Sequence, residues 1–62
     1  MTTDDLRVWQ AAMGYTYAQA FAALGIGNGT YARMLSGESK IDRRTGLACA
    51  ALAAGLEEWR PA

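Results

Sequence analysis

Three glycines stand at alternate positions in the segment GIGNGTY, residues 25–31, and glycine-rich turns are the loops that typically wrap a phosphate. A dinucleotide-binding loop needs a further glycine at Thr30, a preceding strand, and an acidic residue about 20 positions later. A P-loop needs Gly-Lys-Ser/Thr. The segment lacks these residues and meets neither pattern, and helix-forming sequence flanks it on both sides. We therefore interpret Gly25 as the left-handed end of one helix and Gly27 as the start of the next.

Side chains suited to catalysis or metal binding are scarce. The sequence contains no histidine and a single cysteine, Cys49, which has no evident base partner. We therefore expect no enzyme activity, no metal site, no cofactor and no small-molecule ligand. A lone cysteine forms no intrachain disulfide, which is typical of a reducing compartment. Cys49 is interpreted as a small core residue, with redox sensing as the alternative.

Capping residues and glycines limit four predicted helices, and no segment has the alternation of a strand. The first runs from a cap at Thr3 to Gly14, the second from Thr16 to Gly25, the third from Asn28 to about Ser36, and the fourth from Asp42 to Pro61. Their expected buried positions follow helical spacing: Leu6, Trp9 and Met13; Ala20, Phe21 and Leu24; Tyr31, Met34 and Leu35; and Ala48, Leu52, Leu56 and Trp59.

The length of 62 residues predicts a single domain, residues 1–62, near the lower size limit for an independent core. No apolar run approaches the ~18 residues of a membrane span, and MTTDDLR is acidic where a secretory signal would be basic. We expect a cytoplasmic protein with no membrane partner. The formal net charge is zero, but residues 33–44 carry an excess of two positive charges.

The order of caps, glycines and apolar residues resembles the single-domain helix-turn-helix repressors of phages, the Cro and C1 type. The resemblance covers about Leu6 to Leu56 without insertion. It implies an all-α, four- to five-helix, lambda-repressor-like bundle with a helix-turn-helix at about residues 16–36. It further implies a small transcriptional regulator of phage, prophage or mobile-element origin that binds double-stranded operator DNA. The resemblance rests on Gly14, Tyr15, Thr16, Gly25, Ile26, Gly27, Tyr31, Met34 and Gly37.

By this resemblance the helix from Asn28 lies in the major groove. Asn28, Gly29 and Arg33 then stand where such repressors meet base edges, with Thr30 at the wall of the groove. Arginine can bind guanine O6 and N7 through two hydrogen bonds, and asparagine can pair with the N6 and N7 edge of adenine. Gly29 has no side chain for reading and would instead let the backbone approach the DNA.

The resemblance also implies contacts to the DNA backbone. Tyr17 matches a phosphate-contacting position, although it equally fits the apolar stripe with Phe21 and Leu24. Basic side chains in the loop and at the start of the fourth helix would supply the salt-sensitive part of the affinity, or would simply be solvated. The backbone set is Tyr17, Ser36, Lys40, Arg43 and Arg44.

Three features depart from the family pattern. Ala20 precedes Phe21, whereas the family usually has a larger aliphatic residue followed by alanine, so either Phe21 packs in an altered crossing or the second helix is shifted in register. Gln10 stands where arginine is frequent. The zero net charge is low for a DNA-binding protein and favours modest affinity or a dimer.

Two questions about association stay open from the sequence. Leu56 and Trp59 either cover the core as a lid or form an isologous homodimer interface that spaces two recognition helices by ~34 Å. The alternative function is a protein-interaction module of the same fold, an antirepressor or adaptor that docks on another regulator. Net neutrality favours this module, and the basic residues near Arg33 oppose it.

Overall fold

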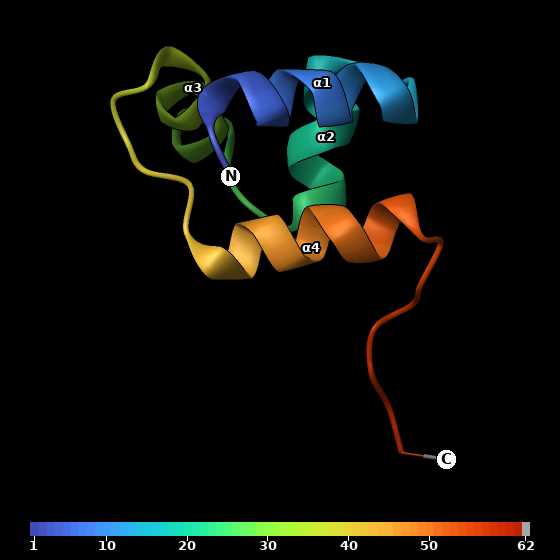
Figure 1. The fold of residues 1–62 in the computed structure, drawn as a ribbon. Helices are drawn as coiled ribbons and strands as arrows, with labels where there is room; N and C mark the ends of the chain where they lie inside the picture. Colours follow the sequence, from blue (N-terminus) through green and yellow to red (C-terminus); the bar gives the residue numbers. More distant parts are fainter. Residues whose placement is uncertain (62) are drawn as a thin grey trace.

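A computed structural model describes residues 1–61 as four helices with no strand in that range. Figure 1 shows α1 and α4 on opposite sides of the molecule, with α2 between them in this view and α3 behind the start of α1. The predicted all-α class is confirmed. No helix among the described residues is long and apolar enough to cross a membrane. The helix bounds are α1 Thr3–Met13, α2 Tyr17–Leu24, α3 Asn28–Ser36 and α4 Arg43–Ala53.

Side-chain caps define where three of the helices begin. Thr16 caps α2 and Asp42 caps α4, as predicted, and each accepts a hydrogen bond from a backbone N–H in the first turn. The prediction for α1 was wrong by one residue, because Thr2 is the cap and Thr3 is already helical. The reason is a reciprocal pair between Thr2 and Asp5, in which each side chain accepts from the other residue's backbone N–H. This pairing lowers the pKa of Asp5.

The turn between α2 and α3 depends on Gly25, which has a φ of +70°. The N–H groups of Gly25 and Ile26 donate to the carbonyl oxygens of Ala22 and Phe21, at 3.1 Å each, and so satisfy the last turn of α2. Gly27 then acts as the N-cap of α3 without a side-chain hydrogen bond. The interpretation of Gly25 as a left-handed stop and of Gly27 as a helix start is therefore confirmed.

The core is small and centres on Tyr31, which is fully buried on α3. Its hydroxyl donates to Gln10 Oε1 on α1 at 2.6 Å, and its burial raises the pKa of the phenol. Trp9 on α1 donates from Nε1 to the backbone oxygen of Cys49 on α4 at 3.0 Å. These two bonds join α1 to α3 and to α4. The core cluster comprises Leu6, Trp9, Ala20, Tyr31, Met34 and Cys49.

The interpretation of Cys49 as a core residue is confirmed. Its side chain is 1% exposed, and burial raises the pKa of the thiol. A buried thiol with a raised pKa is a poor nucleophile, because the thiolate is the reactive form.

The start of α1 also holds the end of α3. Thr3 Oγ1 donates to the carbonyl oxygen of Met34 at 2.9 Å, and Arg7 Nη2 donates to that of Leu35 at 2.8 Å. Carbonyl groups in the last turn of a helix have no partner within the helix and carry partial negative charge. A hydroxyl and a guanidinium from α1 therefore fix α3 by its C-terminal end.

The order Ala20-Phe21 is accommodated without a shift of α2, since the helix keeps its cap at Thr16 and its stop at Gly25. Ala20 is fully buried and takes the core position, while Phe21 is half-buried beside it. The Phe21 ring packs against Tyr17 at 5.7 Å and against Tyr31 at 6.5 Å between ring centroids. An aromatic cluster thus fills the crossing of α2 and α3.

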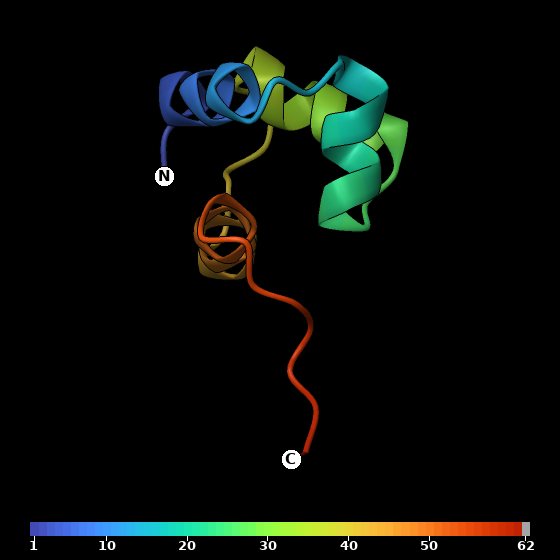
Figure 2. The same cartoon turned by 90° about the vertical axis from the view of Figure 1, so that its right-hand side faces the viewer.

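The prediction that the fourth helix continues to Pro61 was wrong. Helix α4 ends at Ala53, and Gly55 follows with a φ of +73°. The N–H groups of Gly55 and Leu56 donate back to Leu52 and Ala51, which closes the helix and turns the chain outward. Figures 1 and 2 show residues 56–61 extending away from the helices in both views.

The interpretation of Trp59 as a lid on the core was therefore also wrong. Trp59 is 88% exposed and Leu56 is 64% exposed, so neither covers the core. The helical spacing of these residues with Ala48 and Leu52 misled the prediction, because Gly55 interrupts the stripe. Residues 56–61 are called the C-terminal arm below.

We predict that Tyr31→Phe lowers the free energy of unfolding by about 1–2 kcal/mol, because it leaves Gln10 Oε1 without its donor. Urea denaturation followed by circular dichroism measures the change. The matched control is Tyr17→Phe, whose hydroxyl makes only an exposed 3.4 Å contact with the oxygen of Asn28. Equal stability of the two variants would contradict a structural role for the Tyr31–Gln10 bond.

Candidate nucleic-acid interface

The outward face of α3 consists of small or polar side chains. Tyr31 and Met34 are buried on one side of the helix, which turns Asn28, Gly29 and Arg33 toward solvent on the other. Ala32 and Ser36 share the exposed face, which carries no acidic residue. The structure thus brings together three of the four residues predicted to meet base edges.

Arg33 is the only cation on α3, and its side chain lies over Gly29. A Cβ atom built on Gly29 would be 3.6 Å from Arg33 Nη1, which is an ordinary contact distance. Within residues 1–61, the guanidinium forms neither an ion pair nor a hydrogen bond. Its donors are therefore available to an external acceptor.

Thr30, the fourth predicted residue, occupies a different part of the helix. It is half-buried and faces α4, where it lines a cleft described below. The structure therefore separates Thr30 from the surface formed by Asn28, Gly29 and Arg33. Its predicted place at the edge of the reading surface stays a prediction.

Tyr17 packs within the aromatic cluster and also reaches the start of α3. Its ring centroid lies 5.2 Å from that of Tyr31, and its hydroxyl donates to the carbonyl oxygen of Asn28 at 3.4 Å. The Tyr17 side chain is 36% exposed. The two interpretations of Tyr17 are thus compatible, since its ring is packed while its hydroxyl remains beside the exposed face.

Ser36 is used locally at the end of α3. Its hydroxyl donates to the carbonyl oxygen of Arg33 at 3.1 Å and accepts from the N–H of Glu38 at 3.4 Å. These bonds stabilise the last turn of the helix before Gly37. The Ser36 side chain is exposed, and its predicted contact with a DNA backbone stays a prediction.

The start of α4 has a capping carboxylate between two arginines. Asp42 accepts from the Thr45 N–H at 2.9 Å and from Arg44 Nη2 at 2.9 Å. The bonds from Thr45, followed by that from Arg44, lower the pKa of Asp42 to about 2. Asp42 offsets the unfavourable placement of two arginines near the positive end of the helix. It also engages part of the charge of Arg44.

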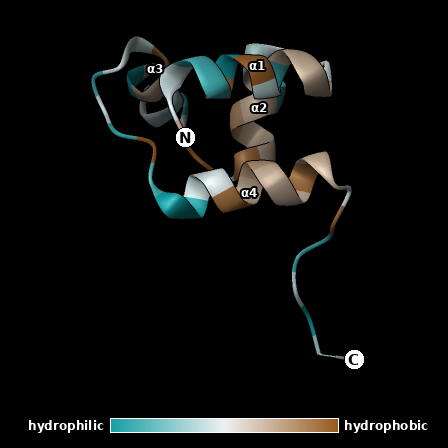
Figure 3. Cartoon of the chain, viewed as in Figure 1, coloured by the Kyte–Doolittle hydropathy of each residue, from teal (hydrophilic) through white to brown (hydrophobic). Residues whose placement is uncertain are grey.

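Two further cations lie in the segment that runs from the end of α3 to the first turn of α4. Lys40, in the loop before α4, and Arg43, in its first turn, are exposed and form no ion pair within residues 1–61. Figure 3 shows the hydrophilic first turn of α4 against the mainly apolar remainder of that helix. These side chains can attract an anion without first breaking an internal ion pair.

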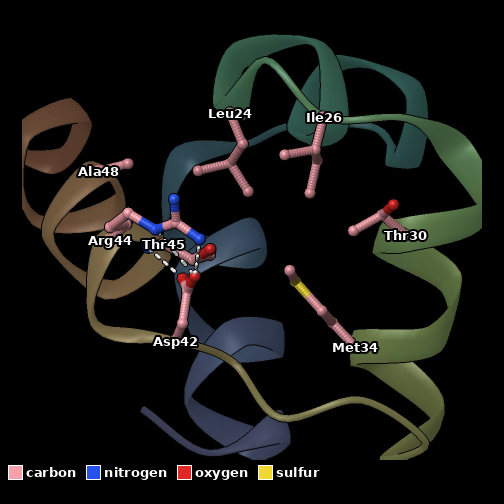
Figure 4. Close-up of a pocket in the computed structure, with 8 residues that line it drawn as sticks. All are labelled: Leu24, Ile26, Thr30, Met34, Asp42, Arg44, Thr45 and Ala48. Carbon is pink, nitrogen blue, oxygen red and sulfur yellow. Dashed lines mark hydrogen bonds and ion pairs between the residues drawn. The ribbon is translucent and has the colours of Figure 1, made fainter.

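A cleft of about 380 Å³ separates α3 from the first half of α4. We call it the α3–α4 cleft. Figure 4 shows side chains from α2, α3 and α4 pointing into it. Its apolar side is formed by Leu24, Ile26, Met34 and Ala48. Its polar side is formed by Thr30, Asp42, Arg44 and Thr45.

Sequence reasoning missed this cleft. Leu24 and Met34 were assigned to the buried stripes of their helices; Met34 is buried, whereas Leu24 is half-buried. The spacing of residues within one helix cannot show that α3 and α4 diverge and leave these side chains facing an open space. The hydrogen bond from Trp9 on α1 to the backbone oxygen of Cys49 holds α4 against α1.

The described residues contain no group of three histidine, cysteine or acidic side chains placed to hold a metal ion. Comparison with models of known protein families finds no match. Neither curated proteins nor solved structures show a significant similarity to the chain. The assignment of a function therefore depends on the geometry and chemistry of the chain itself.

We predict that Asp42 makes stability depend on pH in the acid range. Its pKa is about 2 in the folded chain against an ordinary value of 3.8, so its stabilising effect is fully present above the ordinary value. That effect is lost as the pH falls toward 2. Thermal unfolding between pH 5 and 2 should show a steeper loss for the wild type than for Asp42→Asn, which keeps a capping oxygen without the titration. Parallel curves would contradict the prediction.

Proposed function

We propose that the protein is a sequence-specific DNA-binding transcriptional regulator, in which α2 and α3 act as a helix-turn-helix and α3 enters the major groove. The observation that carries the proposal is the outward face of α3. Asn28 and Arg33 are exposed there, the Arg33 donors are unengaged within residues 1–61, and no acidic side chain lies on the helix. A B-DNA major groove is wide enough to admit one α-helix.

Base recognition is assigned to Arg33 and Asn28. The Arg33 guanidinium can donate to guanine O6 and N7, and Asn28 can pair with adenine N6 and N7. Each such bidentate pair discriminates against the wrong base by roughly 1–3 kcal/mol. Gly29 lies between them on the exposed face, where the absence of a side chain allows the helix backbone to come close to the base edges. Thr30 would stand at the border of this surface.

Phosphate contacts are assigned to the cations of the loop after α3 and of the first turn of α4. Lys40 and Arg43 are unpaired among the described residues, and Arg44 keeps a side chain that is 93% exposed despite its bond to Asp42. Tyr17 and Ser36 add hydroxyl groups at the two ends of α3. Phosphate contacts of this kind position a protein on DNA and weaken as salt rises.

The proposed regulator acts as a homodimer that occupies an operator. The zero net charge limits the electrostatic affinity of one copy, and two linked half-sites raise the overall affinity without new contacts. A two-fold dimer would place its α3 helices about one DNA turn, ~34 Å, apart. No catalytic role is included in the proposal.

A protein-interaction module is the second candidate function. Its support is the exposure of large apolar side chains: Val8 at 67%, Leu47 at 55% and Trp59 at 88%. Such side chains can form the centre of a protein interface. Under this function the molecule would dock on another regulator, and Arg33 would have no special part.

We predict that the purified protein enriches a defined sequence from random duplex DNA at about 0.15 M salt, and that Arg33→Ala loses this enrichment. The control is Arg60→Ala, which removes the same charge from the C-terminal arm, where Arg60 pairs with Glu57. A folded wild type that enriches nothing, or an Arg33→Ala variant that enriches the same sequence as the wild type, would favour the protein-interaction module.

We predict opposite effects of Gly29→Ala on folding and on DNA binding. Gly29 has no positive φ, and the added methyl group meets only the flexible end of Arg33, so the change should stabilise the helix by up to ~1 kcal/mol. The same methyl group should weaken specific DNA binding severalfold, because it lies on the surface that faces the bases. Urea denaturation and fluorescence anisotropy measure the two effects. Unchanged binding would remove Gly29 from the interface.

A further inference from the structure

Ala32 is the residue on the outward face of α3 whose side chain is entirely apolar. Its methyl group is exposed, whereas Tyr31 and Met34 on the same helix are buried. The methyl group therefore does not belong to the core. Asn28 and Arg33 on the same face carry the proposed hydrogen bonds to bases, and a methyl group can form none.

Helical geometry places Ala32 at the centre of this face. Residues three and four positions apart are neighbours on a helix, so Ala32 adjoins Asn28 and Gly29 toward the N-terminus and Ser36 toward the C-terminus. Each Cα–Cβ bond is tilted toward the start of the helix, which directs the Ala32 methyl group toward Asn28 and Gly29. The Ser36 hydroxyl is held by the carbonyl oxygen of Arg33.

We propose that Ala32 is a specificity-determining residue, whose methyl group packs against the 5-methyl group of a thymine in the major groove. The inference rests on the proposed function, because it requires α3 to lie in that groove. It adds a feature of the DNA that Asn28 and Arg33 do not read. The major-groove edge of thymine carries a methyl group, and alanine is among the side chains that make apolar contact with it.

The small side chains beside Ala32 allow this contact. Two apolar carbons touch when they are ~4 Å apart, so the helix backbone must come close to the base edges. Gly29 and Ala32 are neighbours with no atom beyond Cβ, which permits such an approach. Arg33 does not cover the methyl group, because its Nη1 lies over Gly29, in the row of residues beside that of Asn28 and Ala32.

The other use of an exposed alanine is the stability of the helix, since alanine has the highest helix propensity. That use is independent of DNA and predicts equal affinity for duplexes with thymine and with uracil. A contact between methyl groups predicts unequal affinity, because uracil has a hydrogen atom where thymine has the methyl group. The two uses therefore differ in one ratio, the Kd for the uracil duplex divided by the Kd for the thymine duplex.

The test uses the full chain and the duplex that it selects from random DNA at about 0.15 M salt. Fluorescence anisotropy gives the Kd for this duplex and for versions in which one thymine at a time is replaced by uracil. We expect the replacement of one particular thymine in a half-site to raise the Kd roughly fourfold, which corresponds to the loss of one buried carbon group.

Ala32→Gly should reduce the ratio at that thymine to within about 1.5-fold of one, as in a double-mutant cycle between the two methyl groups. Glycine also weakens the helix, but this raises the Kd for both duplexes together and leaves their ratio unchanged. The matched control is Ala12→Gly, which removes the same methyl group from an exposed position of α1 and should keep the fourfold ratio.

A second variant keeps a side chain at the same position. Ala32→Ser has a better helix propensity than Ala32→Gly and places a hydroxyl group beside the thymine methyl group. The hydroxyl group finds no hydrogen-bond partner on a methyl group, so this variant should also lower the ratio. Circular dichroism confirms that each variant is folded.

Three results would overturn the inference. They are a selected sequence with no recurring thymine, a wild type whose Kd is unchanged by every uracil replacement, and an Ala32→Gly variant that keeps the full ratio. In each of them the protein still selects a DNA sequence, so the proposed function stands. A folded wild type that selects no sequence overturns the proposed function, and the contact of Ala32 with thymine falls with it.

Discussion

The buried side chain of Tyr31 connects three of the four helices. It belongs to α3, its hydroxyl donates to Gln10 on α1, and its ring packs against Tyr17 and Phe21 on α2. Because an α-helix is rigid, burying this one side determines which residues of α3 face outward. Asn28 and Arg33 reach solvent as a consequence. The proposed reading surface therefore depends on a bond between α1 and α3 that lies away from it.

A chain of this size compensates for its small core with hydrogen bonds at helix ends. Thr2, Thr16 and Asp42 cap three helix starts, and Thr3 and Arg7 bind the carbonyl groups at the end of α3. Each such bond adds a modest amount to stability. The small core also leaves large apolar side chains exposed to solvent. Exposed apolar side chains of this kind are suited to an interface with another protein chain.

The charge distribution explains how a neutral chain can act on an anionic partner. Acidic side chains near the N-terminus and in the C-terminal arm lie apart in sequence from the cations of residues 33–44. Arg7 and Arg60 are engaged with acids close to them, and Arg44 with its capping carboxylate. Arg33, Lys40 and Arg43 are exposed and form no ion pair within residues 1–61. The proposed interface is therefore locally positive, although the net charge of the whole chain is zero.

Local sequence was sufficient to predict the start of α2 at Thr16, the stop at Gly25 and the cap at Asp42. Caps and left-handed glycines act through hydrogen bonds within a few residues, so their effect is visible in the sequence. The outward position of Asn28 and Arg33 was predictable for a related reason, since helical spacing places them opposite Tyr31 and Met34. The same spacing failed at Trp59, where a stripe drawn through Gly55 ignored the turn that this glycine makes.

Only the packing of the helices decided the α3–α4 cleft and the partner of Gln10. The cleft exists because α4 is held to α1 by the bond from Trp9 to Cys49 while α3 is held to α1 by Tyr31, and no residue spacing within one helix records the gap between them. Gln10 likewise has no local signal for its bond to a residue 21 positions away. Contacts between distant segments depend on all the helices at once. Short-range patterns in this sequence therefore define its helices, whereas the surfaces between the helices are determined only when the chain folds.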